Sequence, residues 1–468
     1  MTKIERAGAL FFSISALVLL SINFYKLYIA NTKPVPTAGG TYEEAIVGDL
    51  KYLNPVTAQS DTDQAVSGLI FSGLVQVSDQ NDIVPDIADH WETSSEGQKY
   101  TFYLKKNVKF SDGVPLTAND IAYTINNIKD PATKSPLYTS WSGVTVSVID
   151  DYTVEFDLPK VYGPFIYNCT FGILPSHLTP DEFSKNVTGS GPYELQKSTN
   201  TKDGSLTASL ELSRNDGYYG PASNIDQIKL DFYSTKDEAV TAFQNDIKIN
   251  AISGAAVDGV RNMSYKSGRQ LGLIANVGSD KMKDITNRQN FFTSQKFSKP
   301  IELSLVTLDE DYQRTEAEAL TEKYKSLNVK LNVQYLTPLQ FPDAIKSRKY
   351  DLLLYGFDFG YDRDPYTFWH SSQIATGMNF AGWSDKNSDI MLEDARMITD
   401  PAQRNAKYDD FFANVVNKQY LAEFFDPISY NFFVRDSVKN IKPITGNQVY
   451  SRYDNIISWY VAEKRVPK

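Results

Sequence analysis

The stretch from Tyr350 to Gln373 reads YDLLLYGFDFGYDRDPYTFWHSSQ. Residues 351–355 form a short apolar run that predicts a buried strand, and an acidic, aromatic loop follows Gly356. In open α/β sheets, ligands bind beyond the carboxyl ends of the strands. Three aspartates and six aromatic residues at this place predict a site for a positively charged organic group with apolar neighbours. The same pattern also fits a surface loop with solvated aspartates and core aromatics.

The residues before this loop predict the sheet from which it leaves. Apolar residues alternate over residues 301–305, follow helical spacing over 317–327, and alternate again over 329–335. Strand, helix and strand within about 35 residues predict a right-handed βαβ unit. A further helix over 338–348 leads into the strand at 351–355. The acidic loop is therefore expected at the end of a βαβαβ sheet.

Length and composition narrow the class of protein. A chain of 468 residues is too long for one core, which predicts two or three domains. Its net charge of −10 and its lack of a basic run argue against nucleic-acid binding. The single cysteine, Cys169, excludes intramolecular disulfides, and the three histidines share no metal-ligand spacing. We therefore expect no cofactor and no enzymatic activity.

The N-terminus predicts a membrane segment. Residues 7–24 are apolar or small almost throughout, and Lys3 and Arg6 precede them. This length is near the lower limit for crossing a bilayer and exceeds the usual hydrophobic region of a signal peptide. We predict an uncleaved signal anchor over residues 1–30, with a cytoplasmic N-terminus and an extracytoplasmic body. A cleaved export signal is the alternative. Residues 31–40 (NTKPVPTAGG) are predicted to form a linker.

Several short segments occur in the order found in one protein family. They are Leu53–Pro55 with 69–74, 84–88 with Trp91, 100–113, 173–177, 189–193, 364–366, 368–373 and 378–380. Through this ordered set the chain resembles the family 5 extracellular solute-binding proteins, the oligopeptide- and dipeptide-binding subunits of bacterial ABC importers.

The resemblance implies an α/β type II periplasmic-binding-protein fold, in which two lobes close around a ligand cleft, here preceded by an N-terminal transmembrane helix. Lobe I would comprise residues 41–253, with an inserted subdomain at about 56–168. Lobe II would comprise residues 254–436, and residues 437–468 would return to lobe I. Residues 255–299 lack a long helix that relatives carry there. Lobe II is therefore expected to be shortened, with looser enclosure of a ligand or a partly lost pocket.

The resemblance also implies site residues. In peptide-binding relatives, a carboxylate just after the strand at 351–355 holds the ligand's α-ammonium group, and backbone groups of both lobes pair with the ligand's main chain. Counting from Gly356 places that carboxylate at Asp358, whereas counting back from Pro365 places it at Asp362. Asp358 is preferred because it lies nearer the strand end. The remaining candidate ligand-binding residues are Gly356, Phe357 and Phe359, and on the first lobe Gln59, Ser60 and Asp61.

The three residues on the first lobe have a second interpretation, because Gln59, Ser60 and Asp61 also fit an N-cap cluster for the helix that follows. The leading hypothesis for function is a monomeric, membrane-tethered receptor that delivers oligopeptides to an ABC permease. One alternative is a sensor, chaperone or surface protein on the same fold. A glycoside hydrolase with Asp358 and Asp362 as its acid/base pair is a further alternative. The histidine and cysteine pattern disfavours direct metal ligation in a nickel-chelate variant.

Overall fold

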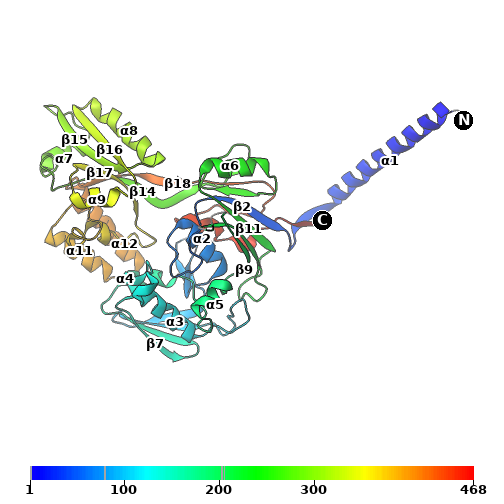
Figure 1. The fold of residues 1–468 in the computed structure, drawn as a ribbon, viewed down its shortest axis with the longest axis horizontal. Helices are drawn as coiled ribbons and strands as arrows, with labels where there is room; N and C mark the ends of the chain where they lie inside the picture. Colours follow the sequence, from blue (N-terminus) through cyan, green and yellow to red (C-terminus); the bar gives the residue numbers. More distant parts are fainter. Residues whose placement is uncertain (1–2, 79–80, 202–203, 205) are drawn as a thin grey trace.

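The computed structural model describes residues 3–78, 81–201, 204 and 206–468, which build a two-lobed body and a projecting N-terminal helix (Figure 1). We call the part built on a seven-stranded sheet lobe I and the part built on a five-stranded sheet lobe II. This architecture confirms the predicted α/β fold of two lobes.

The sheet of lobe I has β2 near its centre, where β2 pairs in parallel with β11 and β12. Tyr42, Ala45 and Ile46 of β2 are buried, as expected for a strand covered on both faces. Buried Glu44 of the same strand accepts hydrogen bonds from Arg452 Nε at 2.9 Å and from the Tyr453 hydroxyl at 2.7 Å. In order across the sheet, the strands are β13 (Arg261–Asn262), β19 (Phe432–Val434), β12 (Ala251–Ser253), β2 (Thr41–Val47), β11 (Gln227–Tyr233), β10 (Thr207–Arg214) and β9 (Tyr193–Asn200).

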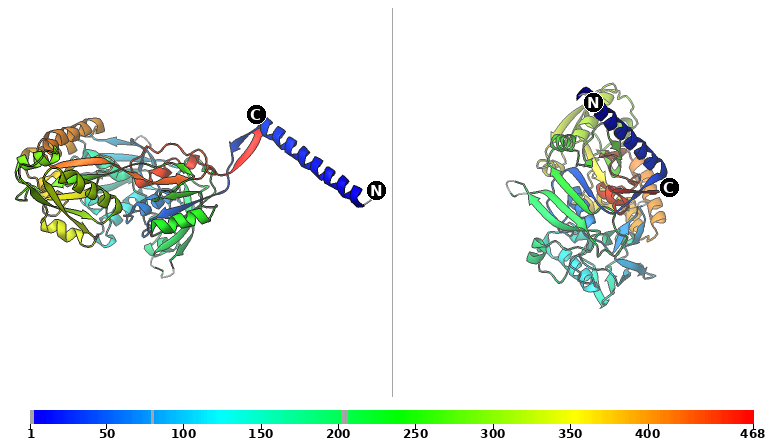
Figure 2. Two further views of the ribbon diagram at one scale, coloured as in Figure 1. Left: turned by 90° about the horizontal axis from the view of Figure 1, so that it is seen from above. Right: turned by 90° about the vertical axis from the view of Figure 1, so that its right-hand side faces the viewer.

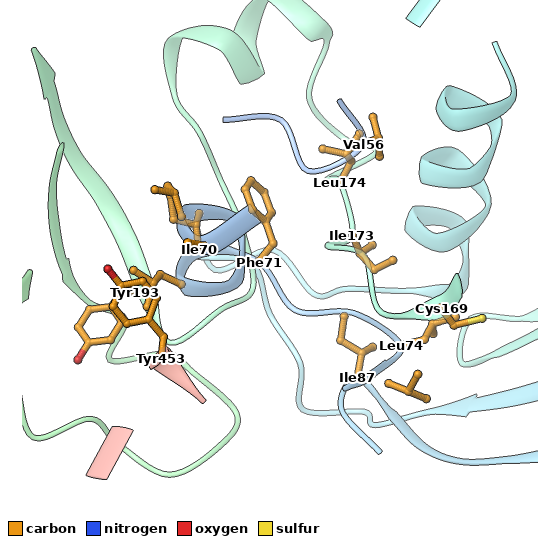
Figure 3. Close-up of a cluster of buried hydrophobic side chains, with 14 of the residues drawn as sticks. Val56, Ile70, Phe71, Leu74, Ile87, Cys169, Ile173, Leu174, Tyr193 and Tyr453 are labelled. Atoms are coloured by element: carbon orange, nitrogen blue, oxygen red, sulfur yellow. The ribbon is translucent and has the colours of Figure 1, made fainter. Parts of the chain in front are cut away.

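Lobe I also carries a four-stranded antiparallel subdomain. Helix α3 (Ala118–Lys129) begins after Thr117, whose backbone N–H donates to the Asp120 carboxylate at 2.7 Å. Figure 3 shows Ile70, at the end of α2, and the adjoining Phe71 in the core of this lobe, to which Ile173 and Leu174 also belong. The remaining elements are β3 (Val75–Val77), β4 (Ile83–Pro85), β5 (Ala88–Thr93), β6 (Lys99–Leu104), β7 (Thr145–Asp150), β8 (Thr153–Asp157), α2 (Asp61–Ile70), α3 (Ala118–Lys129), α4 (Tyr138–Trp141), α5 (Pro180–Lys185) and α6 (Lys236–Asn245).

Lobe II contains the predicted βαβ unit. Strands β15 and β16 are parallel and are joined by α8, whose buried residues include Ala317 and Leu320. Strand β17 continues through Gly356 to Asp358, three residues beyond the predicted strand end, because it pairs with β14 along this whole length. In order, the strands are β16 (Val329–Leu336), β15 (Ile301–Leu308), β17 (Leu352–Asp358), β14 (Tyr265–Ala275) and β18 (Ala422–Tyr430); the helices are α7 (Ile285–Phe292), α8 (Asp311–Lys325), α9 (Phe341–Ser347), α10 (Tyr366–Trp369), α11 (Lys386–Arg396) and α12 (Pro401–Phe411).

Two long antiparallel strands, β14 and β18, run from one lobe into the other (Figure 1). The side chain of Tyr265, at the start of β14, belongs to the core of lobe I, whereas Leu271 and Leu273 belong to a core of lobe II. The last part of the chain then returns to lobe I, where Tyr453, Ile456 and Trp459 join its core. The two lobes are therefore connected by extended strands that lie beside each other.

Helix α1 (Lys3–Asn31) extends away from the body (Figure 2). Its segment Ile14–Asn31 is long and apolar enough to cross a membrane, and none of it is buried in the protein. Strand β1 (Thr32–Pro36) follows directly and pairs with β20 (Glu463–Pro467) near the C-terminus. Part of the stretch that the sequence predicts as a linker therefore forms a strand, because β20 satisfies its backbone.

Candidate ligand-binding site

A cavity of about 590 Å³ lies between the lobes. This volume falls within the range of small-molecule binding sites. Lobe I provides most of its walls, chiefly from α2, the segment after α2, the 3₁₀ helix Gly163–Cys169 and the segment near Tyr450. From lobe II, the lining residues are Arg269, Asp358, Gly360 and Tyr361. Both lobes therefore contribute to the walls of one cavity.

Asp358 lies in the cavity wall at the end of β17, where the sequence predicts the ligand carboxylate. Its Oδ1 atom accepts the Gly360 backbone N–H at 2.9 Å, and its Oδ2 atom accepts Arg269 Nε at 3.3 Å. The side chain is 35% exposed. Because a carboxylate has about four acceptor positions, Asp358 can accept further hydrogen bonds from a ligand.

Arg269 connects this carboxylate to lobe I. In the β14–β17 pair it lies directly opposite Asp358, which puts the two side chains on one face of the sheet. Its Nη1 and Nη2 atoms also donate to the two oxygens of Asp61 in α2, at 2.7 and 2.6 Å. Burial disfavours the charged guanidinium, but the hydrogen bonds and charges of Asp61 and Asp358 raise the pKa of Arg269 above its usual value. The group Asp61–Arg269–Asp358 thus combines two anions with one cation.

Tyrosines form a second contact between the lobes beside the cavity. The hydroxyls of Tyr361 in lobe II and Tyr450 in lobe I are 3.2 Å apart. The ring of Tyr361 also stacks on that of Tyr167, with centroids 6.3 Å apart and an interplanar angle of 13°. Burial raises the pKa of Tyr450 to about 12. The cavity therefore has neutral, aromatic hydrogen-bonding groups next to its charged group.

A third contact is formed where the Gly163–Cys169 helix meets lobe II. A methyl group on Gly163 would overlap the carbonyl oxygen of Ile398 and lie 2.9 Å from Arg404 Nη1. Next to it, the guanidinium of Arg396 lies 5.3 Å from the ring centroid of Tyr162. Only glycine permits the two backbones to approach this closely.

Asp362, the alternative ammonium-binding residue, lies away from the cavity walls. Its carboxylate pairs with Arg404, whose Nε donates to both oxygens at 2.8 and 3.1 Å, and it accepts the Tyr408 hydroxyl at 3.2 Å. Asp362 is 7% exposed and Arg404 is fully buried. Burial raises the pKa of Asp362, and the hydrogen bonds and charge of Arg404 oppose this shift. This carboxylate is occupied by partners within lobe II.

The predicted aromatic neighbours also belong to the core of lobe II. Phe357 is 1% exposed, stacks on Phe359 at 5.7 Å and meets Phe368 edge-on at 4.8 Å. Gly356 faces the hydroxyl of Tyr312 rather than the cavity. Since side chains alternate along a strand, Asp358 points to the opposite side from Phe357. Of the candidates in this segment, Asp358 lines the cavity, whereas Gly356, Phe357 and Phe359 do not.

On lobe I, Gln59 and Ser60 belong to an N-cap cluster, which is one of the two interpretations that the sequence allows. The Ser60 hydroxyl accepts the Asp63 N–H at 3.0 Å, and the Asp63 carboxylate accepts the backbone N–H groups of Gln59 and Ser60. These three residues cap α2. Asp61 is not part of the cap, because its carboxylate faces Arg269. The structure brings together Asp61 and Asp358, which are 297 positions apart in the sequence.

Two residues of the site are missed by sequence reasoning. Arg269 lies in a polar stretch without periodicity, and only the pairing of β14 with β17 brings it to the aspartates. Asp86 lines the cavity with a buried carboxylate that accepts the Tyr219 hydroxyl and the Gly73 N–H. Burial raises the pKa of Asp86 to about 6, against the opposing effects of Tyr219 and Lys105. Across the described part of the chain, no cluster of three histidine, cysteine or acidic side chains is arranged to hold a metal ion.

Comparisons with known proteins agree with this architecture. Residues 82–289 match the model of the bacterial extracellular solute-binding proteins, family 5 (middle region). The oligopeptide-binding protein AppA of Bacillus subtilis is 20% identical in an alignment that covers 92% of this chain and 93% of AppA. The residues that match the family model include the four-stranded subdomain, strands β9 to β13 of the lobe I sheet and the start of lobe II.

Solved structures share the whole fold. The ABC transporter substrate-binding protein CtaP of Listeria monocytogenes superposes with a TM-score of 0.76 at 20% identity, over 91% of this chain and 99% of CtaP. AppA of Bacillus subtilis in complex with a nonapeptide gives a TM-score of 0.68 at 18% identity, over 92% of this chain and all of that structure. The family model thus matches residues 82–289, and the solved structures show that the chain has the fold of these binding proteins.

Proposed function

We propose that this protein binds oligopeptides in the cavity between its lobes and delivers them to an ABC permease. The fold of AppA, which holds a nonapeptide in its solved complex, supports a peptide as the ligand class. The cavity is built from both lobes, as expected for a ligand that holds the lobes together. The protein would bind and release the peptide without converting it chemically.

The group Asp61–Arg269–Asp358 carries this proposal. With two carboxylates and one guanidinium, it retains one negative charge at the cavity wall. The Asp61 carboxylate is engaged by two hydrogen bonds from Arg269, whereas Asp358 receives only one longer bond from Arg269. A peptide α-ammonium bound to Asp358 would complete the neutralisation without displacing Arg269. Such a charge-assisted hydrogen bond contributes about 1.5–3 kcal/mol.

The cavity walls suit recognition of a main chain rather than of particular side chains. At Gly68 and Gly360, no heavy atom lies within 4 Å of the position that a Cβ would occupy. Ligand backbone can therefore approach the protein backbone at these two residues. Tyr361 and Tyr450 add hydroxyl groups beside apolar ring surface. This combination tolerates varied side chains, as in backbone-directed peptide binding.

Delivery to a permease would use the arrangement of the lobes. A ligand that contacts both lobes favours the arrangement in which they touch, and a permease that prefers this arrangement would select the loaded protein. We propose that α1 is retained as a single membrane-spanning anchor, which keeps a monomeric body at the outer face of the membrane. Cleavage of α1 would instead release the body.

The direct test is to identify what co-purifies with the full chain. Native mass spectrometry should detect peptides with free N-termini, and Asp358→Asn should reduce their occupancy. The variant Asp280→Asn, which removes an exposed carboxylate from an ion pair within lobe II, serves as a matched control. A full chain that retains no peptide, and that binds none from a library of free-amine peptides, would refute the proposal.

A further inference from the structure

The two-stranded ribbon β1–β20 forms a junction between the membrane helix and the body. The Arg465 guanidinium donates to the Thr32 hydroxyl at 2.9 Å, to the Thr32 carbonyl at 2.9 Å and to the Ile29 carbonyl at 3.3 Å. The backbone N–H of Lys468 donates to the Asn31 carbonyl at 3.0 Å. Carbonyl groups at the end of α1 that lack helical partners are thus satisfied by the C-terminal strand. The ribbon and the helix end form one hydrogen-bonded unit.

In the register of the ribbon, successive side chains of each strand point to opposite faces. Lys33 lies opposite Val466, and Val35 lies opposite Lys464. Directly opposed residues of an antiparallel pair share a face, and every second residue returns to that face. One face therefore carries Lys33, Val35, Lys464 and Val466, whereas Arg465 lies on the other face with Thr32. Lys468 directly follows β20 and is held beside the ribbon by its backbone hydrogen bond to the Asn31 carbonyl.

This face has the composition of a membrane-interface surface. Lys33, Lys464 and Lys468 are exposed, and the two valines between them are half-buried. Phe24, Tyr25 and Tyr28 near the end of α1 are 74%, 64% and 47% exposed. Aromatic residues of this kind collect at the level of lipid headgroups. The ribbon β1–β20 joins this end of α1 (Figure 2).

Charge complementarity identifies the partner. The whole chain has a net charge of −10, yet one face of the ribbon carries Lys33 and Lys464, and a third lysine, Lys468, directly follows β20 beside the membrane helix. Anionic headgroups attract basic residues next to a membrane anchor and repel an acidic body. We propose that the Lys33–Lys464–Lys468 face of the ribbon binds anionic phospholipid headgroups of the membrane that holds α1, and so fixes how the body stands on that membrane. This inference rests on the proposed retention of α1, not on the proposed peptide ligand.

The test compares the full chain in nanodiscs of phosphatidylcholine alone and in nanodiscs that also contain phosphatidylglycerol. A water-soluble acylating reagent, read out by mass spectrometry, reports how accessible each lysine is. Because a basic residue near an anionic surface gains about 1 kcal/mol, we expect Lys33, Lys464 and Lys468 to react about fivefold more slowly with phosphatidylglycerol present. Lys160, Lys346 and Lys349, which are exposed on the body, should react equally in both. High salt should remove the difference.

Variants test whether the face acts as a unit. Lys464→Gln with Lys468→Gln should return the reaction rate of Lys33 towards its value in phosphatidylcholine, whereas Lys346→Gln with Lys349→Gln should leave it unchanged. Slow hydrogen exchange of the β1 and β20 amides would verify that the ribbon still forms in the variant. Equal rates at the ribbon lysines in both nanodiscs would overturn the inference. If the full chain inserts into neither nanodisc, α1 is not a membrane anchor and the inference fails. Peptide binding by the body would then be measured separately.

Discussion

Arg269 in lobe II and Asp61 in lobe I form a bidentate ion pair, with N–O distances of 2.7 and 2.6 Å. The same guanidinium reaches Asp358, so the contact between the lobes and the proposed ammonium site share one arginine. A ligand bound at Asp358 would therefore add to a group that already joins the lobes. We therefore expect ligand binding and the arrangement of the lobes to be coupled through this group.

Removing the Asp61 carboxylate should let the lobes separate in the ligand-free protein. Partly exposed ion pairs contribute up to about 1 kcal/mol, so Asp61→Asn should shift the population towards separated lobes by about fivefold. Small-angle X-ray scattering would detect this as a larger radius of gyration. Asp280→Asn removes an ion pair within lobe II and should leave the radius unchanged. An identical radius for Asp61→Asn and the unmodified protein would contradict the coupling.

Gly163 should control how closely the lobes approach at the other contact. A methyl group there would overlap the Ile398 carbonyl, so Gly163→Ala should push the lobes apart and weaken ligand binding. Gly68→Ala is a control for the spacing of the lobes only, because nothing lies within 4 Å of its added methyl group, although Gly68 itself lines the cavity. Distances between fluorophores on the two lobes should increase for Gly163→Ala alone. Equal distances in both variants would show that this contact does not set the spacing.

The two candidate aspartates should differ in their effect on stability. Asp362 and Arg404 are buried together, and removing one partner of such a pair costs about 3–5 kcal/mol. Asp358 is partly exposed, and losing its contact with Arg269 costs about 1 kcal/mol at most. Urea unfolding of Asp362→Asn and Asp358→Asn should show this difference. Similar losses of unfolding free energy would contradict the structural role of Asp362.

Asp86 should make stability depend on pH. Its pKa in the folded protein is about 6, above the ordinary value of 3.8, so between these values the folded state binds more protons than the unfolded state. The unfolding free energy therefore decreases as pH rises through this window, and should increase by roughly 1 kcal/mol from pH 7 to pH 5. The Asp86→Asn variant should lack this pH-dependent change in unfolding free energy. Tyr219→Phe should move it to higher pH, because the Tyr219 hydroxyl lowers the pKa of Asp86. Parallel pH profiles for Asp86→Asn and the unmodified protein would contradict this assignment.

Local sequence patterns predict the elements whose side chains face a core. The alternation in 301–305 and 329–335 and the helical spacing between them correspond to β15, β16 and α8, because each buries one regular face. Strand β14 has no such pattern in its first half, where Lys266 to Gln270 are mostly polar. That half runs between the lobes, so no single core imposes a periodicity on it.

The site is predictable only in part for a related reason. The position of Asp358 follows from the end of a strand, which is a local feature. The partners of Asp358 do not follow from any local feature, because Arg269 is 89 positions from Asp358 and Asp61 is 208 positions from Arg269. Likewise, the spacing of Asp358 and Asp362 cannot separate their roles. The two aspartates differ because Asp362 is buried and pairs with Arg404, which α12 brings to it.

Calorimetry on Asp358→Asn tests the ammonium assignment most directly. The peptide identified by mass spectrometry would be titrated in its free-amine and N-acetylated forms into the unmodified protein, Asp358→Asn and Asp61→Asn. Loss of a charge-assisted bond predicts that Asp358→Asn weakens the free-amine form by about 10- to 100-fold and the acetylated form far less. Asp61→Asn should weaken both forms through the contact between the lobes, with some further loss for the free-amine form because the group loses its net negative charge. Equal losses for both peptide forms in Asp358→Asn would contradict the ammonium site.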